Sequence, residues 1–411
     1  MMKVKYIFIY SVAILLVTTG KSVQAQQTLS LEEAWKKAAT VSADANFSNA
    51  IYSLAESESK VGVVMPFLNT LVEAGQINSA LTDTKITLSQ SGYFPSYHKA
   101  FKNRQEGSKV LAASEKQLRE WNIRKMVTSL YVQHHYLNAV KNLYENQDSL
   151  FRQALERAKL RLTTGESDGV EVVEATAQLS HLQQLRQETE SMLYAVLSVF
   201  RTLTGTSDTT LPGEIDDVTS LLPIDVGVKS EVQHPYLQRL ETEMQYNQLE
   251  ANWKRAQRKP MWTLAFNNTS FRGIGADDRV YGASSRFSSV QLGVAFPIFG
   301  SQSSKIDEVI KRTEEKTTAE KYLAEMKITN QRNTALMRWQ RLQDQMLVFE
   351  QQSLPLAAQL QEIARNKLKN GEIDFMKYAY MTEQAQSLLL DYASLKKQVN
   401  EAAVDYHFVT F

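Results

Sequence analysis

Histidine is the first residue type to examine for chemistry, because its side chain binds metals and transfers protons near neutral pH. His134 and His135 are adjacent within a predicted helix, so they face different directions and do not form the i, i+4 pair of a zinc site. The other histidines are scattered: His98, His181, His234 and His407. The pattern predicts no metal site.

Other groups that carry catalysis are also absent from the sequence. There is no cysteine, which excludes disulfides and thiolate metal sites. No glycine-rich phosphate loop and no nucleophile elbow occurs. Lys plus Arg is 46 and Asp plus Glu is 45, so no basic excess points to nucleic acid. The sequence therefore predicts a protein that is not an enzyme, has no cofactor and does not bind nucleic acid.

Two stretches with charged residues are typical of the same turn between helices. RLTTGESD covers residues 161–168 and KLKNGEID covers residues 367–374, and their glycines lie 206 positions apart (371 minus 165). Each glycine can adopt the left-handed conformation that ends a helix. We predict two helical hairpin tips, formed by Gly165, Glu166, Asp168, Gly371, Glu372 and Asp374.

Side chains after each glycine are predicted to cap the helix that follows. Ser167 or Asp168 would cap in the first tip, and Asp374 in the second. Asp168 with Glu171 three residues later resembles a capping box. These residues can therefore be interpreted as helix caps alone, without a role in docking or gating.

Long helices must hold these tips in place. Residues 96–163 contain no proline and follow one helical pattern, which would reach about 100 Å. A second pattern runs from residue 299 to 370, and Pro355 inside it is predicted to kink or split the helix.

Apolar residues at alternating spacings of three and four predict coiled-coil seams along these helices. The first seam is looser, because Arg186 and Thr189 interrupt it: Ala175, Leu179, Leu182, Leu193, Val196 and Phe200. The second comprises Trp339, Leu342, Met346, Phe349, Ser353, Leu356, Leu360 and Ile363, and the third comprises Met381, Ala385, Leu388, Tyr392, Leu395, Val399, Ala402 and Tyr406.

Segments between pairs of prolines alternate between apolar and polar residues, which predicts β-strands. They cover residues 67–74, 84–91, 261–270 and 288–297. A tilted strand of about nine to eleven residues can cross a bilayer, but a soluble hairpin packed on a helix alternates in the same way. GIGADD at residues 273–278 is predicted to be a hairpin loop.

The same order of parts occurs twice. A shorter helix (28–65, then 235–259) precedes two strands, a long helix, a tip and a further helix. Ser30 is predicted to cap the first of these shorter helices, with Glu33 three residues later. The predicted organisation is a signal peptide over 1–25, a first repeat over 26–205, a linker over 206–233 and a second repeat over 234–411.

The N-terminus is typical of an exported protein. A basic leader, an apolar run and a small residue at Ala25 predict a cleaved signal peptide, and without cysteine the chain is not a lipoprotein. After residue 25 no apolar run approaches about 18 residues, so a chain that crosses a membrane would do so as a β-barrel.

With this arrangement the sequence resembles the TolC-like outer membrane efflux proteins. The resemblance rests on the equal spacings Ala158 to Gly165 and Ala364 to Gly371, each followed by a heptad helix. PMWTLAFNN at 260–268 and VQLGVAFPIFG at 290–300 also resemble the family. The duplicated order of all these parts covers essentially the whole mature chain.

The resemblance implies a mainly α fold with a small β part, built from duplicated half-molecules. It implies a homotrimer in which four strands per chain share a 12-stranded outer membrane β-barrel and the helices form a periplasmic tunnel. The function implied is a passive exit duct for small molecules or metal ions in a tripartite efflux or type I secretion system. The partners implied are a periplasmic adaptor at the tips and an inner membrane pump of the resistance-nodulation-division type. The location implied is the outer membrane of a Gram-negative bacterium.

The resemblance also suggests a pore constriction beyond the tips. Some family members carry acidic residues six and nine positions after the second tip glycine, where this chain has Lys377 and Tyr380. The first tip has Glu171 and Glu174 at the corresponding positions. We hypothesise a mixed ring in which Glu171 or Glu174 pairs with Lys377 and holds the entrance closed.

The alternative function is a periplasmic coiled-coil scaffold or adaptor that never enters the membrane. It accounts for the helices and the export signal. It does not account for four alternating strands at equivalent places in both halves.

Overall fold

The computed structural model describes residues 27–167, 169–214, 234–296 and 302–410. The predicted signal peptide and most of the predicted linker lie outside these ranges. The chain divides into two compact units, and each combines residues from both predicted halves. The first unit comprises Met1–Ser42, Ile123–Ile224 and Met337–Asp405, and the second comprises Ala43–Asn122, Asp225–Leu336 and Tyr406–Phe411.

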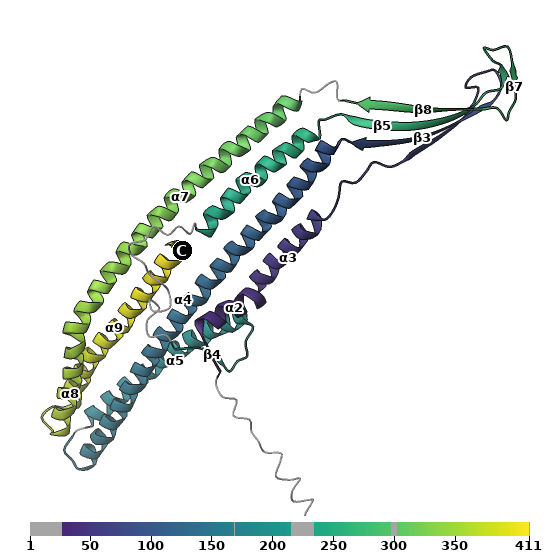
Figure 1. Cartoon of the computed structure of the whole chain (residues 1–411). Coiled ribbons are helices and arrows are strands. Elements are labelled where there is room, and N and C mark those ends of the chain that lie inside the picture. The colour runs from purple at the N-terminus through teal and green to yellow at the C-terminus, as the bar shows by residue number, and fades with distance from the viewer. Residues whose placement is uncertain (1–26, 168, 215–233, 297–301, 411) are drawn as a thin grey trace, which may run out of the picture. The chain divides into compact units, whose positions relative to one another are not determined.

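Eight α-helices make up most of the described residues (Figure 1). They are α2 (Leu31–Val41), α3 (Ala43–Ser59), α4 (Pro95–Thr163), α5 (Val170–Thr204), α6 (Pro235–Ala256), α7 (Gln302–Val348), α8 (Leu354–Lys369) and α9 (Phe375–Thr410). Helix α4 confirms the long helix predicted over residues 96–163. None of these described helices is both long and apolar enough to cross a membrane.

The prediction of a single helix over residues 28–65 is wrong, because these residues form two helices. Helix α2 ends at Val41 and α3 ends at Ser59, well before residue 65. The predicted cap at Ser30 is confirmed: Glu33 N donates to Ser30 Oγ at 3.4 Å, and Ser30 N donates to Glu33 Oε2 at 3.1 Å.

The break predicted at Pro355 is confirmed, and it has a specific form. The chain passes from α7 through a π-helical segment, Phe349–Ser353, into α8. Proline has no N–H to donate to the carbonyl four residues back, so the α-helical ladder is interrupted there.

The π-helical segment corrects part of the predicted seam. Trp339 and Leu342, before it, are buried as predicted, but Leu356 and Ile363, after it, are 55% and 45% exposed. The wider turn takes up one extra residue. The buried positions therefore shift by one, to Ala357 and Ala364.

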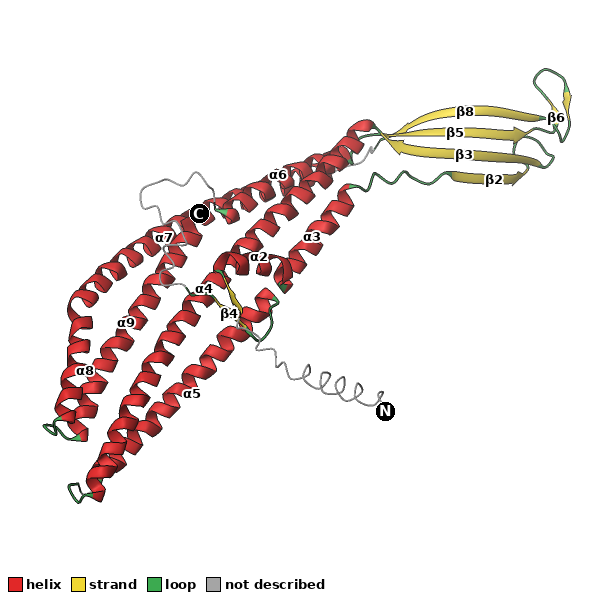
Figure 2. Ribbon diagram, turned by 60° about the horizontal axis from the view of Figure 1, so that its bottom comes forward, coloured by secondary structure: helices red, strands yellow, loops and turns green. Residues whose placement is uncertain are grey.

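Four antiparallel strands form the main sheet (Figure 2). Their order is β2 (Asn69–Gly75), β3 (Asp83–Tyr93), β5 (Met261–Ser270) and β8 (Arg286–Ala295). All four predicted strands are confirmed, with ends that shift by at most two residues. The predicted loop at 273–278 contains β6 (Gly273–Ile274), which pairs with β7 (Val280–Tyr281).

The register gives this sheet one apolar and one polar face. Leu88, Phe266 and Val290 are opposite one another across three strands, so they share a face. Thr87, Asn267 and Ser289 share the other face, where Thr87 Oγ1 donates to Asn267 Oδ1 at 2.8 Å. Apolar side chains on the first face are exposed: Val72, Leu264, Phe266, Val290, Leu292 and Val294.

A small parallel sheet in the first unit was not predicted. Strand β1 (Gln27–Leu29) pairs with β4 (Thr210–Pro212). The buried Tyr131 on α4 donates its hydroxyl to Leu29 O at 2.5 Å, and Gly213 N donates to the same carbonyl at 2.7 Å. A tyrosine of the long helix thus anchors the first strand.

The histidine pair lies in this same region and has structural contacts. His135 Nε2 is 2.9 Å from Gly213 O, and the ring of His134 is 3.1 Å from Asn138 Nδ2. Burial, with a smaller contribution from His135, lowers the pKa of His134 to about 4. His134 is therefore neutral at pH 7.

Candidate functional site: the two hairpin tips

The two tips share one backbone structure. Gly165 and Gly371 have φ values of 77° and 73°, which confirms the predicted left-handed conformation. In the first tip Glu166 N donates to Arg161 O at 2.8 Å, and Gly165 N donates to Leu162 O at 3.2 Å. In the second tip Glu372 N donates to Lys367 O at 2.9 Å and Gly371 N to Leu368 O at 3.2 Å. Both turns are thus Schellman motifs, in which only the glycine needs positive φ.

The tips differ in how the following helix begins. In the second tip Lys377 N donates to Asp374 Oδ1 at 2.8 Å, so the predicted cap at Asp374 is confirmed. In the first tip α5 begins at Val170 with Gly169 at its N-cap, so Ser167 is not the cap. Asp168 lies outside the described residues. Gly169 has a φ of 88°, a second left-handed residue that lengthens the turn and delays the helix.

An ion pair closes the first tip in place of a side-chain cap. Arg161 Nη1, at the end of α4, lies 2.8 Å and 3.1 Å from the two carboxylate oxygens of Glu171, at the start of α5. The Glu171 side chain is only 15% exposed. The equivalent positions in the second tip are Lys367 and Lys377, two cations, so the clamp exists in one tip only.

The four candidate constriction residues have different partners within the chain. Glu171 is held by Arg161, whereas Lys377 Nζ lies 5.5 Å from the centre of the Tyr380 ring. Glu174 is half-buried, and its Oε2 has no hydrogen-bond partner among the described residues. Within the described part of one chain, no ion pair joins Lys377 to either glutamate. The hypothetical ring would therefore form between chains.

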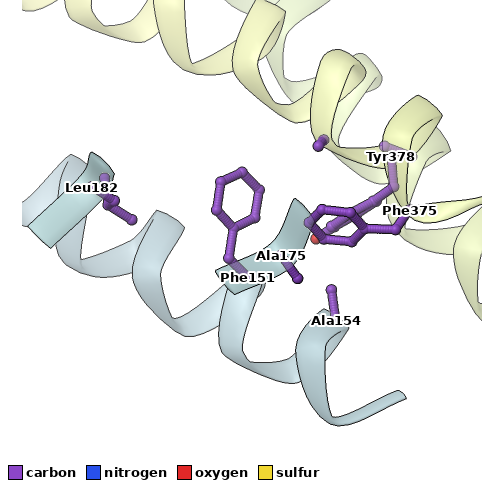
Figure 3. Close-up of a cluster of buried hydrophobic side chains, with 8 residues drawn as sticks. Phe151, Ala154, Ala175, Leu182, Phe375 and Tyr378 are labelled. Carbon is purple, nitrogen blue, oxygen red and sulfur yellow. The ribbon is translucent and has the colours of Figure 1, made fainter. Parts of the chain in front are cut away.

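A buried cluster holds the two hairpins together next to the tips (Figure 3). The rings of Phe151 on α4 and Phe375 on α9 meet edge to face, with centroids 6.1 Å apart. Burial raises the pKa of Tyr378, so its hydroxyl stays protonated at neutral pH. The other members of the cluster are small or aliphatic: Ala154, Ala175, Leu182, Ala364 and Ala379. All four helices of the two hairpins contribute to it.

Exposed apolar residues around the first tip were missed in the sequence. Leu160, Leu162, Val170 and Val173 are between 42% and 70% exposed. Val170 and Val173 do not continue the seam that begins at Ala175, and this is the signal that could have identified them as surface residues. These four residues are candidates for contact with a partner protein.

Comparison with known proteins identifies the fold. No family profile matches the chain, and no curated protein matches its sequence. Solved structures do match. The Campylobacter jejuni CmeC outer membrane channel has a TM-score of 0.72 at 12% identity, over 92% of this chain and 85% of that chain.

Two further outer membrane proteins give the same result. VceC, an outer membrane protein from Vibrio cholerae, has a TM-score of 0.70 at 14% identity, over 92% of this chain and 96% of that chain. The open state of the Neisseria gonorrhoeae MtrE outer membrane channel has a TM-score of 0.70 at 12% identity, over 92% of this chain and 88% of that chain. The chain thus has the fold of these channels along almost its whole length, which confirms the predicted resemblance at the level of fold.

Proposed function

We propose that this chain, which has the fold of the TolC-like outer membrane channels, is one subunit of a homotrimeric exit duct in the outer membrane. The duct is a passive conduit that receives small molecules or metal ions from a periplasmic adaptor and an inner membrane pump. Most of each subunit lies in the periplasm, after export by a signal peptide. The protein catalyses no reaction of its own.

The observation that carries this proposal is the exposed apolar face of the main sheet. On β8 every residue is exposed, and Leu292 is 85% exposed between Val290 and Val294. A soluble protein rarely leaves such a continuous apolar surface in water. Lipid would cover this face, while the opposite face, with Thr87, Asn267 and Ser289, would line a water-filled lumen.

The open edges of the sheet support assembly into a trimer. Strands β2 and β8 each have one neighbour in the described sheet, so each leaves a row of backbone groups unpaired. In lipid such groups cost several kcal/mol each, and closure of the sheet removes them. Pairing of β2 with β8 of the next chain satisfies both edges, and three chains of four strands give twelve.

Cysteine labelling along β8 tests this placement, because the chain has no cysteine of its own. Single substitutions Ser289→Cys and Gln291→Cys should react with a membrane-impermeant maleimide in intact cells. Val290→Cys and Leu292→Cys should stay unlabelled until detergent is added. Equal labelling of all four in intact cells would contradict a lipid-facing side, and no labelling of any of them before detergent is added would favour the periplasmic scaffold. Release of the protein by osmotic shock, without detergent, would point the same way.

The tips are proposed as the adaptor-docking end. Adaptor hairpins would contact Gly165, Glu166, Asp168, Gly371, Glu372 and Asp374, together with the exposed apolar residues Leu160, Leu162, Val170 and Val173. The two tips would offer different chemistry, since the Arg161–Glu171 clamp belongs to the first tip and the second tip has Lys367 and Lys377 at the equivalent positions.

The constriction hypothesis gives a separate prediction at Lys377. If Lys377 pairs with a glutamate of a neighbouring chain, Lys377→Glu replaces attraction by repulsion three times around the axis. Glu174 is the better partner, because Glu171 already holds Arg161. Each exposed pair contributes under about 1 kcal/mol, so only the threefold set could hold a gate. We expect a higher resting conductance in planar bilayers for Lys377→Glu, and an unchanged current would exclude the ring.

A further inference from the structure

Three aromatic side chains gather at the loop end of the main sheet, on its polar face. Phe287 pairs with Thr269 in the register, so it lies on the side of Asn267 and Ser289. Phe271 and Tyr281 join it, with ring centroids 6.4 Å and 5.3 Å from that of Phe287. The centroids of Phe271 and Tyr281 are 5.8 Å apart. All three contacts are edge to face, an arrangement that stabilises aromatic pairs.

The short β6–β7 hairpin that carries Tyr281 is held in a defined position. Gly275 N donates to Arg279 O at 2.8 Å, and Phe271 N donates to Ser285 O at 3.2 Å. The Tyr281 hydroxyl donates to Asp277 Oδ2 at 2.8 Å. The aromatic group is therefore built into the turn and is not a chance contact.

The loop between β2 and β3 fixes the other side of this end. Asp83 is fully buried, and its carboxylate accepts from Asn78 N at 3.3 Å and from the Ser270 hydroxyl at 3.4 Å. Asn78 Nδ2 donates to Ser270 O at 3.3 Å. A loop of the first half is thus tied to a strand of the second half.

An open pocket of about 510 Å³ lies among these residues, within the size range of small-molecule sites. It is lined by Phe271, Tyr281, Phe287, Asp277, Asn78 and Thr269, with Gly275 and Ala276. Phe287 is 49% exposed, so its ring is accessible to a ligand. Asp277 has Arg279 Nε 3.8 Å away, which offsets its charge. A ligand in this pocket would therefore contact mainly aromatic rings and few uncompensated charges.

We propose that this pocket binds aromatic rings of small molecules at the outer mouth of the channel. The inference rests on the proposed function, because the polar face lies on the exit path only if it lines the lumen. A trimer would carry three such pockets around the exit. Molecules with aromatic rings would pause there, whereas aliphatic molecules of the same size and charge would pass freely.

Block of single channels in planar bilayers tests the site, with purified full-length protein. The probe is tetraphenylphosphonium, and the matched control is tetrabutylammonium, which has the same charge and no rings. We expect tetraphenylphosphonium to block the wild-type channel at least about tenfold more strongly, since several ring-to-ring contacts add to the attraction from buried apolar area. Phe287→Leu, which keeps apolar packing and removes the ring, should lose most of this difference. Phe287→Trp should keep it.

Phe266→Ala is the control variant, because Phe266 is a similarly exposed ring on the opposite face of the sheet. It should leave the block unchanged. Equal block by the two cations, or equal block of wild type and Phe287→Leu, would overturn the site while the channel itself stands. Absence of channels in the wild-type protein would instead overturn the proposed function, and the site with it.

Discussion

Leu292→Lys is expected to prevent assembly of the protein in the outer membrane, whereas Gln291→Lys next to it is expected to be tolerated. Both positions lie on β8 and both are exposed in a single chain, so burial within the chain does not distinguish them. Only their faces differ. Leu292 is opposite Leu264 on the apolar face, and Gln291 is opposite Ala265 on the polar face.

The free-energy cost of each lysine depends on whether its face of β8 is in contact with lipid or with water. A lysine on the lipid face of a barrel costs about 2–4 kcal/mol near the middle of the bilayer, and a lumen-facing lysine costs little. The proposed homotrimer would contain the substitution three times, so the total would approach roughly 6–12 kcal/mol. That is comparable to the whole stability of many proteins.

The measurement is the amount of trimer extracted from outer membranes by detergent. Wild type and Gln291→Lys should give similar yields, and Leu292→Lys should give almost none. Similar yields from the two lysine variants would show that β8 does not face lipid. Loss of both would show that β8 tolerates no charge on either face, which the barrel proposal does not predict.

Local rules were enough to predict much of this fold. The helix-ending glycines Gly165 and Gly371 could be identified because one residue type meets the need for positive φ. The strands could be identified because alternation is a property of each segment alone, and β5 was predicted without error at 261–270. The caps at Ser30 and Asp374 depend on side chains within three residues.

Longer-range features escaped prediction for physical reasons. Strand β1 pairs with β4, and a three-residue strand carries too little pattern to suggest a partner so distant in the chain. The seam residues Leu356 and Ile363 were wrongly placed because heptad counting assumes an uninterrupted α-helix. The Arg161–Glu171 clamp spans a turn whose length depends on Gly169, so the sequence spacing gave no signal for it.

Phe375→Ala should loosen both hairpins and not only its own. Phe375 is 2% exposed, and it packs in the cluster where α4, α5, α8 and α9 meet. Removal of a buried phenylalanine ring costs about 3–5 kcal/mol, because apolar contacts are lost and a cavity remains. Ala175 and Ala364, both fully buried, are too small to fill that space.

Hydrogen exchange of the backbone amides measures this coupling. Protection should fall by roughly 150-fold to 5,000-fold near Phe375, the factor that corresponds to a loss of about 3–5 kcal/mol. Because Phe151 lies against the same ring from the other hairpin, the amides around residues 151–182 should lose protection as well. Met376→Ala is the matched control, since Met376 is the next residue and is 58% exposed. The free energy of opening that hydrogen exchange reports for Met376→Ala should stay within about 0.5 kcal/mol of the wild-type value.

The same variant connects packing to gating. If the cluster keeps the tips together in the resting channel, Phe375→Ala should also raise the resting conductance, although it changes no charge. A rise in Phe375→Ala without a rise in Lys377→Glu would mean that apolar packing, and not the proposed ring of charges, holds the entrance closed. Loss of protection confined to α8 and α9 would mean that the hairpins move independently, and a gate built on their contact would then be excluded.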